Sequence, residues 1–316
     1  NSSADSIEKL RSNEIFTEKN KFGNQIYFGK GDIRDFDFMK FIFQKAIDEK
    51  TPIDSVLHFA GLKSVSDSVI YPIKYWENNV AGTINLLKVM EIYNCFTLVF
   101  SSSATIYGNS NESFFVESSN INPINPYGQT KSVIEKLLYD IFNMNIHKWR
   151  IANLRYFNPI GAHPSGKLGE ETFSKVSNIF PIILNTAMGE IKNLEVFGKD
   201  WPTKDGTCIR DYIHIMDLAD AHIAALNYLN KQKSDFISLN IGTGKGTSVL
   251  ELIKIFEKVN SCTVPFVFMC RRKGDAPVSV ANNSLALNKL NWSPKRKIED
   301  MCRDGWRWQK FKSKNK

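Results

Sequence analysis

Tyr127 and Lys131 stand four residues apart in the segment NPYGQTK, residues 125–131, and together could perform proton transfer. Asn125 and Pro126 before them are typical of a helix start, because Asn caps helix N-termini and Pro fits the first turn. Side chains four residues apart lie on the same helix face. A tyrosine pKa of about 10 is too high for a base at neutral pH, so a nearby positive charge must lower it.

Three serines offer a hydroxyl beside this pair. Ser101, Ser102 and Ser103 end the segment FTLVFSSS, residues 96–103, which predicts a buried strand. A serine at that end could hydrogen-bond the same substrate oxygen that Tyr127 deprotonates. The alternative is that the serines only cap a turn and that the Tyr-Lys spacing arose by chance. The order of strand, serines and helix favours the catalytic interpretation.

Strands and helices alternate along the first half of the chain. Strands are predicted at residues 24–29, 53–60, 96–103 and 150–158, and helices at 36–50, about 70–93 and 126–144. Strands that alternate with helices of about ten or more residues pair in parallel, with helices on both faces of the sheet. The pattern therefore predicts an α/β fold with a doubly wound, Rossmann-like parallel sheet, whose ligands bind beyond the carboxyl ends of its strands.

The alternation of strands and helices is less regular in the second half of the chain. Short strands are predicted at residues 193–198 and 264–269, among connections that contain Gly and Pro. We expect a first domain over residues 1–160 and a smaller α+β substrate lobe over 161–316. Parts of residues 205–245, which predict a strand, a helix and a strand, are expected to return to the large sheet.

Composition favours a globular enzyme. The 316 residues are 42% hydrophobic and 23% charged, and no apolar run approaches the ~18 residues of a membrane span. No signal peptide is recognisable. The formal charge of +8 is spread along the chain, so nucleic acid and membrane are not expected partners, and a phosphorylated small molecule fits as well. Scattered cysteines without a C-x-x-C pair indicate a reducing, cytoplasmic setting and no cysteine-based metal site: Cys95, Cys208, Cys262, Cys270 and Cys302.

Six motifs carry a family resemblance. They are LHFAGLKSV (57–65), FSSSATIYG (100–108), NPYGQTK (125–131), LRYFNPIGAHPSG (154–166), GTCIRDYIHIMDLADAH (206–222) and RRKGD (271–275). In this order and spacing they resemble the UDP-glucose 4-epimerases, which are extended short-chain dehydrogenase/reductases. The resemblance covers essentially the whole chain. Related sugar-nucleotide dehydratases usually carry an acidic pair in place of Ala104 and Thr105, so the motifs favour the epimerases.

The resemblance implies NAD-dependent interconversion of UDP-glucose and UDP-galactose. Tyr127 would remove the proton from the sugar 4-hydroxyl while hydride passes from C4 to the nicotinamide; the 4-keto sugar then turns over, and hydride returns to its other face. Lys131 would position the nicotinamide ribose and lower the tyrosine pKa, and Ser103 would hold the sugar oxygen. A homodimer formed by the helices near residues 70–93 and 126–144 is also implied.

The same resemblance assigns residues to the two ligands. Contacts with NAD are implied for Asn1, Ser2, Asp32, Ile33, Phe59, Ala60, Gly61, Leu62, Lys63, Asn78, Tyr127, Lys131 and Phe157. Contacts with the UDP-sugar are implied for Lys63, Ser103, Tyr127, Asn158, Asn178, Ile179, Glu195, Val196, Phe197, Arg210, Arg272, Lys273, Gly274, Asp275 and Ser279. Arg210 and Arg272 suit a diphosphate, because guanidinium groups can bind it in bidentate fashion. The residues alone leave alternatives open, since Asp32 could cap a turn, Phe59 could belong to the core and Asn78 to a helix surface.

One departure from the family pattern concerns the cofactor loop. No Gly-rich turn of the G-x-x-G-x-x-G type precedes the first predicted strand. We therefore expect this sequence to be a piece of a longer enzyme that begins just after the second strand, and we expect the chain as written to bind NAD weakly. GTGKG at residues 242–246 comes too late to replace that turn, and we interpret it as a strand-to-helix connection rather than a second phosphate loop.

Two further departures affect the sugar site. Residues 172–176 differ from the Pro-Gln-Gly-Ile-Pro run of the family, which alters the loop before Asn178. Ser279 occupies a position that is a bulky tyrosine in some relatives and small in others. Room beside the sugar 2-position is therefore expected, and with it turnover of N-acetylated UDP-sugars. The alternatives are a related UDP-sugar decarboxylase or pentose epimerase, and a non-catalytic nucleotide-sugar binder.

Overall fold

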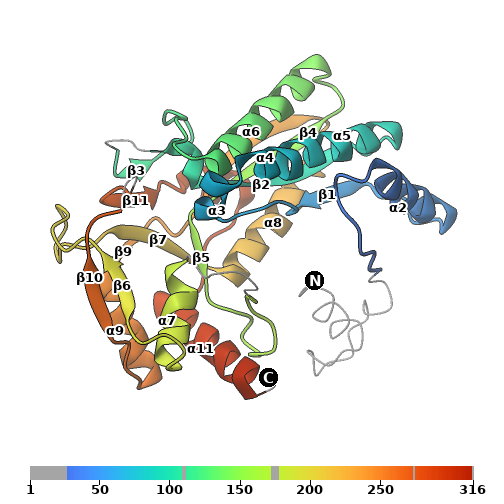
Figure 1. Ribbon diagram of the computed structural model, residues 1–316. Helices are drawn as coiled ribbons and strands as arrows, with labels where there is room; N and C mark the ends of the chain where they lie inside the picture. Colours follow the sequence, from blue (N-terminus) through green and yellow to red (C-terminus); the bar gives the residue numbers. More distant parts are fainter. Residues whose placement is uncertain (1–26, 109–111, 172–177, 273–274, 315–316) are drawn as a thin grey trace.

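Parallel strands form the centre of the molecule (Figure 1). The computed structural model describes residues 27–108, 112–171, 178–272 and 275–314. Within them, the first sheet has four parallel strands in the order β1 (Ser55–His58), β2 (Thr97–Ser103), β4 (Arg150–Tyr156) and β8 (Asp235–Ile241). Ser103, Tyr156 and Ile241 are partners in the register, so the last three strands end level at the carboxyl edge.

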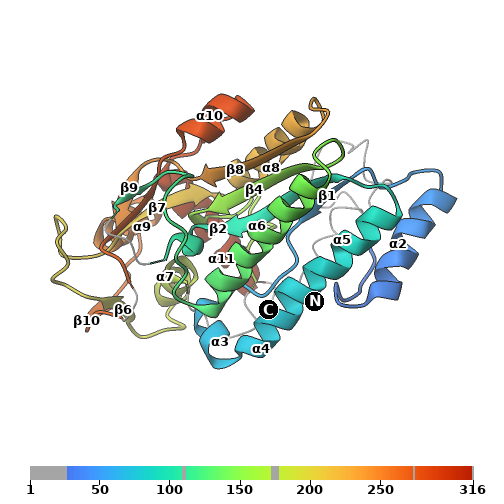
Figure 2. The same cartoon turned by 90° about the horizontal axis from the view of Figure 1, so that it is seen from above.

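Helices cover both faces of this sheet (Figure 2). One face carries α2 (Phe36–Asp48), α5 (Gly82–Ile92) and α6 (Pro126–Met144), and the other carries α8 (Ile215–Leu229) and α10 (Ser284–Leu290). Alternating side chains of β2 explain the arrangement, because Leu98 and Phe100 pack with the first group whereas Val99 packs with α8 and α10. The sheet is therefore apolar on both faces, as is typical of parallel sheets.

A second sheet and a strand pair account for the other strands of the described residues. The sheet has the order β3 (Phe114–Phe115), β11 (Val278–Ala281), β7 (Ile209–His214) and β5 (Asn158–Ile160), with β9 (Gly246–Ser248) antiparallel to β7. The parallel pair consists of β6 (Leu194–Phe197) and β10 (Phe266–Met269). Three more helices pack together around the aromatic side chains of Phe180, Phe256 and Trp306. These helices are α7 (Ile179–Ala187), α9 (Val249–Asn260) and α11 (Ile298–Lys314).

Most predicted elements are present, with shifted ends. The strand predicted at residues 24–29 is wrong for residues 27–29, which form no strand, while residues 24–26 lie outside the described part. The physical reason is the lack of a hydrogen-bonding neighbour, since β1 pairs only with β2 within the described residues and Tyr27 is 70% exposed.

The β8 strand, which lies within the segment 205–245 expected to return to the large sheet, pairs with β4 in the first sheet. The domain division at residue 160 stays a prediction.

The helix predicted at about 70–93 is a run of shorter segments. It consists of α3 (Val65–Ile70), α4 (Pro72–Tyr75), the π-helix η2 (Trp76–Ala81) and α5. Tyr71 separates α3 from α4, because Pro72 lacks an amide proton and disfavours helical geometry in the residue before it.

None of the described helices has the length and apolar composition that crossing a membrane requires.

The glycine-rich loop at residues 242–246 holds an internal carboxylate. Asp211, which is fully buried, accepts hydrogen bonds from the amides of Thr243 (2.8 Å) and Gly244 (2.9 Å) and from the Thr243 hydroxyl (2.6 Å). Ala281 donates a further amide at 3.2 Å. Successive loop amides can form a nest that binds anions, and here the chain's own Asp fills it. The amides of the loop are thus occupied by the chain's own carboxylate, as expected if it is not a phosphate loop, but the loop leads from β8 into the short strand β9 before α9 begins rather than directly into a helix.

A buried ion pair joins α6 to the first sheet. Arg155 donates from Nη2 to Oε2 of Glu135 at 2.7 Å and from Nε to Oε1 at 3.1 Å, and the Ser102 hydroxyl donates to Oε1 at 2.5 Å. Side chains of the pair are only 5% and 6% exposed. Arg155 also donates to the Tyr107 hydroxyl at 3.0 Å and to the Glu117 carbonyl at 2.8 Å. This network stabilises the sheet end from which Ser103 emerges.

We expect Glu135→Gln to lower the free energy of unfolding by about 3 kcal/mol, because it leaves the Arg155 cation buried without its counter-charge. Urea unfolding followed by circular dichroism measures this. Asp140→Asn is the matched control on the same helix, since the Lys136–Asp140 pair is 68% and 55% exposed and is expected to contribute less than ~1 kcal/mol. Equal losses in the two variants would contradict the prediction.

Candidate active site

Ser103, Tyr127 and Lys131 lie together at the carboxyl edge of the first sheet. Ser103 ends β2, while Tyr127 and Lys131 lie in the first two turns of α6. Ser103 is close enough to Tyr127 for its hydroxyl to lower the pKa of the phenol. The Lys131 ammonium lies 5.8 Å from the centre of the Tyr127 ring. The fold thus brings together the three side chains that the sequence singled out.

A glycine lets the two elements approach this closely. Asn125 caps α6 by accepting a hydrogen bond from the Gly128 amide at 2.8 Å. A Cβ atom on Gly128 would lie 2.8 Å from the carbonyl oxygen of Thr105, in the short 3-10 helix η3 (Ala104–Tyr107). Only a residue without a side chain fits this contact, which holds Tyr127 beside the end of β2.

Lys131 is an almost fully buried cation, 4% exposed. Its Nζ donates a hydrogen bond to the Ser101 carbonyl at 2.7 Å and lies 4.7 Å from the centre of the Phe100 ring. Burial lowers the pKa of Lys131 to about 8, and the negative charge of Glu135 opposes that shift. At pH 7 most of the population is protonated, which provides a fixed positive charge beside Tyr127.

Without bound ligands, Tyr127 cannot act as a base near neutral pH. Burial raises the pKa of Tyr127 to about 12, and the Ser103 hydroxyl acts in the opposite direction. The sequence predicts that Lys131 lowers this pKa, but Lys131 is not among the groups that shift it in the protein, where the desolvation of the phenol dominates. A further positive charge must act on Tyr127 before it accepts a proton near neutral pH.

The turn after β1 exposes a surface that could receive a ligand. Residues 59–61 and Lys63 are exposed, and Phe59 retains 56% of its surface, so the alternative of a core phenylalanine is excluded. One side of the Phe59 ring is covered by His222, with ring centres 4.7 Å apart. Lys63 is paired with Glu170 at 2.5 Å.

Two adjacent asparagines of η2 lie near this turn. Asn78, the predicted residue, is half-buried, whereas Asn79 is 2% exposed and was not predicted. The Asn79 side chain accepts a hydrogen bond from the Leu62 amide at 2.7 Å and donates one to the Leu62 carbonyl at 3.0 Å. Both residues have the same type, so only the register of the π-helix decides which one points inward.

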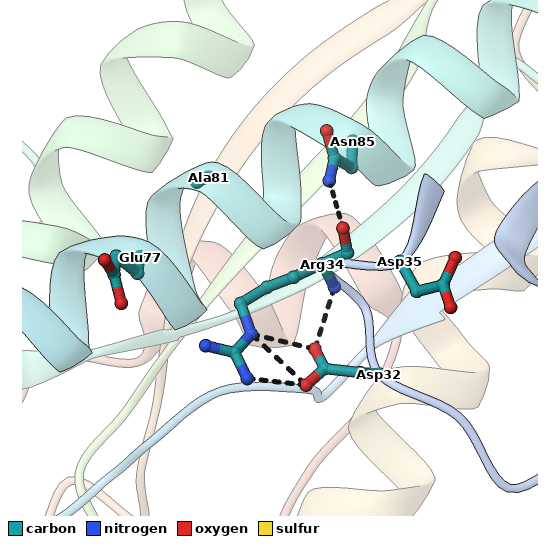
Figure 3. A pocket seen from close by; sticks show the side chains of 6 residues that line it. All are labelled: Asp32, Arg34, Asp35, Glu77, Ala81 and Asn85. Carbon is teal, nitrogen blue, oxygen red and sulfur yellow. Dashed lines mark hydrogen bonds and ion pairs between the residues drawn. The ribbon is translucent and has the colours of Figure 1, made fainter. Parts of the chain in front are cut away.

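Asp32 lies in a shallow hollow of about 550 Å³ beside α2 and η2 (Figure 3). Its carboxylate accepts hydrogen bonds from the Arg34 amide at 2.9 Å and from the Arg34 guanidinium at 2.7 Å, which hold the Asp32 pKa at about 2. Asp32 therefore does stabilise a turn, the alternative left open by the sequence. It remains 45% exposed, with Ile33 half-buried beside it.

A second cluster contains the predicted arginines. Asp275 lies 3.8 Å from Nη2 of Arg210 and 3.3 Å from Nε of Arg272. The Arg272 guanidinium lies 4.8 Å from the centre of the Phe197 ring. Ser279 on β11 is the register partner of Arg210 on β7. One carboxylate thus holds two cations together beside an aromatic ring, and an anionic ligand could bridge the two cations.

The remaining predicted residues differ in exposure. Partly or fully exposed side chains belong to Asn158, Asn178, Ile179 and Glu195. Phe157 and Val196 are 7% and 2% exposed, so their backbone is what a ligand could reach. Outside the described residues lie Asn1, Ser2, Lys273 and Gly274. In the described part of the chain, no three His, Cys, Asp or Glu side chains gather as a metal site.

Comparisons with known proteins agree on one family. The model of the GDP-mannose 4,6 dehydratase family matches residues 1–305. "UDP-glucose 4-epimerase 2" of Arabidopsis thaliana is 46% identical over 308 residues, which cover 98% of this chain and 85% of the relative.

Solved structures agree in fold as well. A UDP-glucose-4-epimerase from Stenotrophomonas maltophila, with bound NAD and formylated UDP-arabinopyranose, is 40% identical with a TM-score of 0.89 over 98% of this chain and 96% of that one. The enzyme of Bifidobacterium longum in complex with NAD+ and UDP is 40% identical, with a TM-score of 0.83 over 90% and 83% of the two chains. The chain therefore belongs to the UDP-glucose 4-epimerases, within the broader sequence family that is named for GDP-mannose 4,6 dehydratase.

Proposed function

We propose that Tyr127, Ser103 and Lys131 carry out the NAD-dependent interconversion of UDP-glucose and UDP-galactose, the reaction of this family. The observation that supports this most strongly is their convergence at the carboxyl edge of a parallel sheet, where such folds bind ligands. Tyr127 takes the proton of the sugar 4-hydroxyl on its phenolate oxygen and later returns one. Ser103 hydrogen-bonds the same sugar oxygen and keeps it within reach of Tyr127.

The residues of the β1 turn fit NAD. An exposed aromatic ring at Phe59, the small residues Ala60 and Gly61, and the Lys63 cation form a surface that suits flat rings and phosphate groups. When bound at this turn, NAD would supply reversible hydride transfer at sugar C4, and its positive ring would lower the tyrosine pKa. Lys131, anchored on the Ser101 carbonyl, contributes a second fixed positive charge at Tyr127.

The arginine cluster is proposed to hold the diphosphate of the UDP-sugar. Asp275 keeps Arg210 and Arg272 close, so a diphosphate can accept hydrogen bonds from both guanidinium groups at a small entropic cost. Phe197 supplies an apolar surface beside Arg272. A firmly held nucleotide leaves the sugar free to turn over, which epimerisation at C4 requires.

Ala104 and Thr105 favour epimerisation over dehydration. Thr105 donates its hydroxyl to Ser103 Oγ at 2.8 Å, and neither residue can act as an acid near neutral pH. Elimination from the 4-keto sugar needs an acid and a base at this edge. Without them, the 4-keto sugar can only be reduced again.

We expect Tyr127→Phe to lower kcat for UDP-galactose by about 1,000-fold, because the phenyl ring keeps the packing and loses the proton-transfer group. A coupled assay of UDP-glucose formation measures kcat and KM in the full-length enzyme. Tyr139→Phe on the same helix is the control, since Tyr139 is 46% exposed and lies three turns from Tyr127. Turnover within tenfold of wild type in Tyr127→Phe would exclude this role. Turnover of UDP-xylose in preference to UDP-galactose would instead support the pentose epimerase alternative.

Ser279 is proposed to leave room for an N-acetyl group at the sugar 2-position. We expect wild-type enzyme to turn over UDP-N-acetylgalactosamine and Ser279→Tyr to lose at least tenfold in kcat/KM for it, while UDP-galactose changes less than threefold. Chromatographic separation of the epimers measures both. Ser279→Ala is the size-matched control and should retain both substrates. Wild-type enzyme that converts only UDP-galactose would refute the proposal.

A homodimer through the helices of residues 70–93 and 126–144, which are α4, η2 and α5 together with α6, belongs to the same proposal, as does a cytoplasmic location. Exposed apolar side chains on these helices support the dimer, among them Ile73 (72%), Ile92 (53%) and Val133 (39%). All five cysteines are free, which supports a reducing compartment.

We expect Ile73→Asp to convert the dimer to a monomer, because it places a charge in the apolar contact. Sedimentation velocity measures the mass. Ile223→Asp, at a 53% exposed position of α8, should leave the dimer intact. A wild-type protein that sediments as a monomer at micromolar concentration would contradict the proposed interface.

A further inference from the structure

Arg271 stands next to Arg272 in the chain, yet the proposed chemistry gives it no part. Both residues follow β10, which pairs with β6 away from the first sheet (Figure 1). The Arg272 guanidinium lies 4.8 Å from the centre of the Phe197 ring, beside the proposed diphosphate site. The Arg271 guanidinium instead lies 4.2 Å from the centre of the Trp201 ring. Consecutive arginines therefore contact two different aromatic side chains.

Three contacts hold the Arg271 side chain in one direction. Its Nε donates a hydrogen bond to Oδ1 of Asp200 at 2.9 Å, and its Nη2 donates to the Asp200 backbone carbonyl. The third contact is the Trp201 ring, since a planar guanidinium stacks well on an aromatic face. The side chains of the Arg271–Asp200 pair are 40% and 69% exposed, and exposed pairs contribute little to folding stability. The three contacts therefore orient Arg271 more than they stabilise the fold.

The Trp201 indole connects Arg271 to the end of β6. Its Nε1 donates a hydrogen bond to the Phe197 carbonyl at 3.2 Å. Gly198, the next residue, has a φ of +85°, and a Cβ atom there would lie 2.3 Å from Nε1 of Trp201 and 3.1 Å from Cγ of Arg271. Only glycine therefore allows the indole and the arginine stem to pack against this turn.

The loop of residues 199–207, which carries Asp200 and Trp201, is itself fixed. The Trp201 amide donates to the Gly206 carbonyl at 3.0 Å, which closes the loop. Asp205 in the same loop accepts a hydrogen bond at 2.5 Å from the hydroxyl of Ser248 in β9. Since β9 pairs with β7, the support of Arg271 is tied to the second sheet.

We propose that Arg271 is a positioning residue for the UDP-sugar. Together with Asp200 and Trp201 it forms a brace that directs the neighbouring Arg272 onto Phe197 and toward the diphosphate. This inference rests on the proposed role of Arg272. Without the brace, Arg272 must be ordered when the nucleotide binds, and this loss of conformational entropy weakens binding. The nucleotide stays bound through every step of the reaction, so the loss is expected in KM rather than in kcat.

Calorimetric binding of UDP and steady-state kinetics with UDP-galactose test the brace in the full-length enzyme. For Arg271→Gln we expect the Kd of UDP and the KM of UDP-galactose to rise about tenfold, with kcat within about threefold of wild type and NAD retained. Trp201→Ala should behave like Arg271→Gln, because it removes the ring that Arg271 covers. Trp201→Phe is the conservative variant, which keeps an aromatic ring beneath the guanidinium and should bind UDP within about threefold of wild type.

A double-mutant cycle separates positioning from direct contact with the nucleotide. If Arg271 acts only through Arg272, then Arg271→Gln should weaken UDP binding by less than about twofold in an Arg272→Gln background. A residue that bound the nucleotide by itself would keep its full effect there. Losses that multiply in the double variant would therefore overturn the proposal.

Arg303→Gln is the matched control for the loss of an exposed arginine. Arg303 pairs with Asp300 on α11 at 2.7 Å, with side chains 49% and 38% exposed, and its loss should leave UDP binding unchanged. The inference is overturned if Arg271→Gln binds UDP within twofold of wild type while Arg272→Gln binds it at least tenfold more weakly, or if Arg303→Gln loses as much affinity as Arg271→Gln. Wild-type affinity for UDP in Arg272→Gln would instead refute the diphosphate site of the proposed function.

Discussion

A single ammonium group, that of Lys131, imposes much of the surrounding structure. A cation at 4% exposure requires partners, because an isolated buried charge is costly. The Ser101 carbonyl and the Phe100 ring, both from β2, provide them on one side. One turn further along α6, Glu135 contributes negative charge and is itself neutralised by Arg155 of β4. The same cation and the burial of the ring keep His58 neutral, with its pKa lowered to about 3, so that the ring can serve as a simple donor to Thr83.

The two sheets meet at the carboxyl end of β4. The chain leaves β4 at Tyr156 and enters β5 of the second sheet at Asn158, with Phe157 buried between them. The Phe157 amide donates to the Ile241 carbonyl at 3.1 Å, which fixes the crossing against β8. Asn158, which is assigned to the sugar nucleotide, therefore follows the first sheet with almost no intervening loop. A rigid crossing of this kind suits a reaction in which one ligand is held still while part of another turns over.

The elements that could be predicted from the sequence are those set by residues close together in the chain. The Asn-Pro start defined α6 at 126–144, and the run of apolar residues before Ser101 defined β2, since capping and burial act over a few residues. The inward direction of Asn79 depends on a π-helix formed by tertiary packing, which Asn78 and Asn79 alone could not reveal. Arg210 and Asp275 are far apart in sequence, and only the resemblance to a family placed them in one site. Burial of Tyr127, which raises its pKa, likewise depends on neighbours from several elements.

Asp211 determines whether the glycine-rich loop at residues 242–246 can bind phosphate groups. An enzyme that handles a dinucleotide and a sugar nucleotide works in the presence of many phosphate-bearing metabolites. Open nests of backbone amides attract such anions without regard to what the phosphate is attached to. In this loop the amides of Thr243 and Gly244 already donate to the Asp211 carboxylate, so they are not free to bind the phosphate of a passing metabolite.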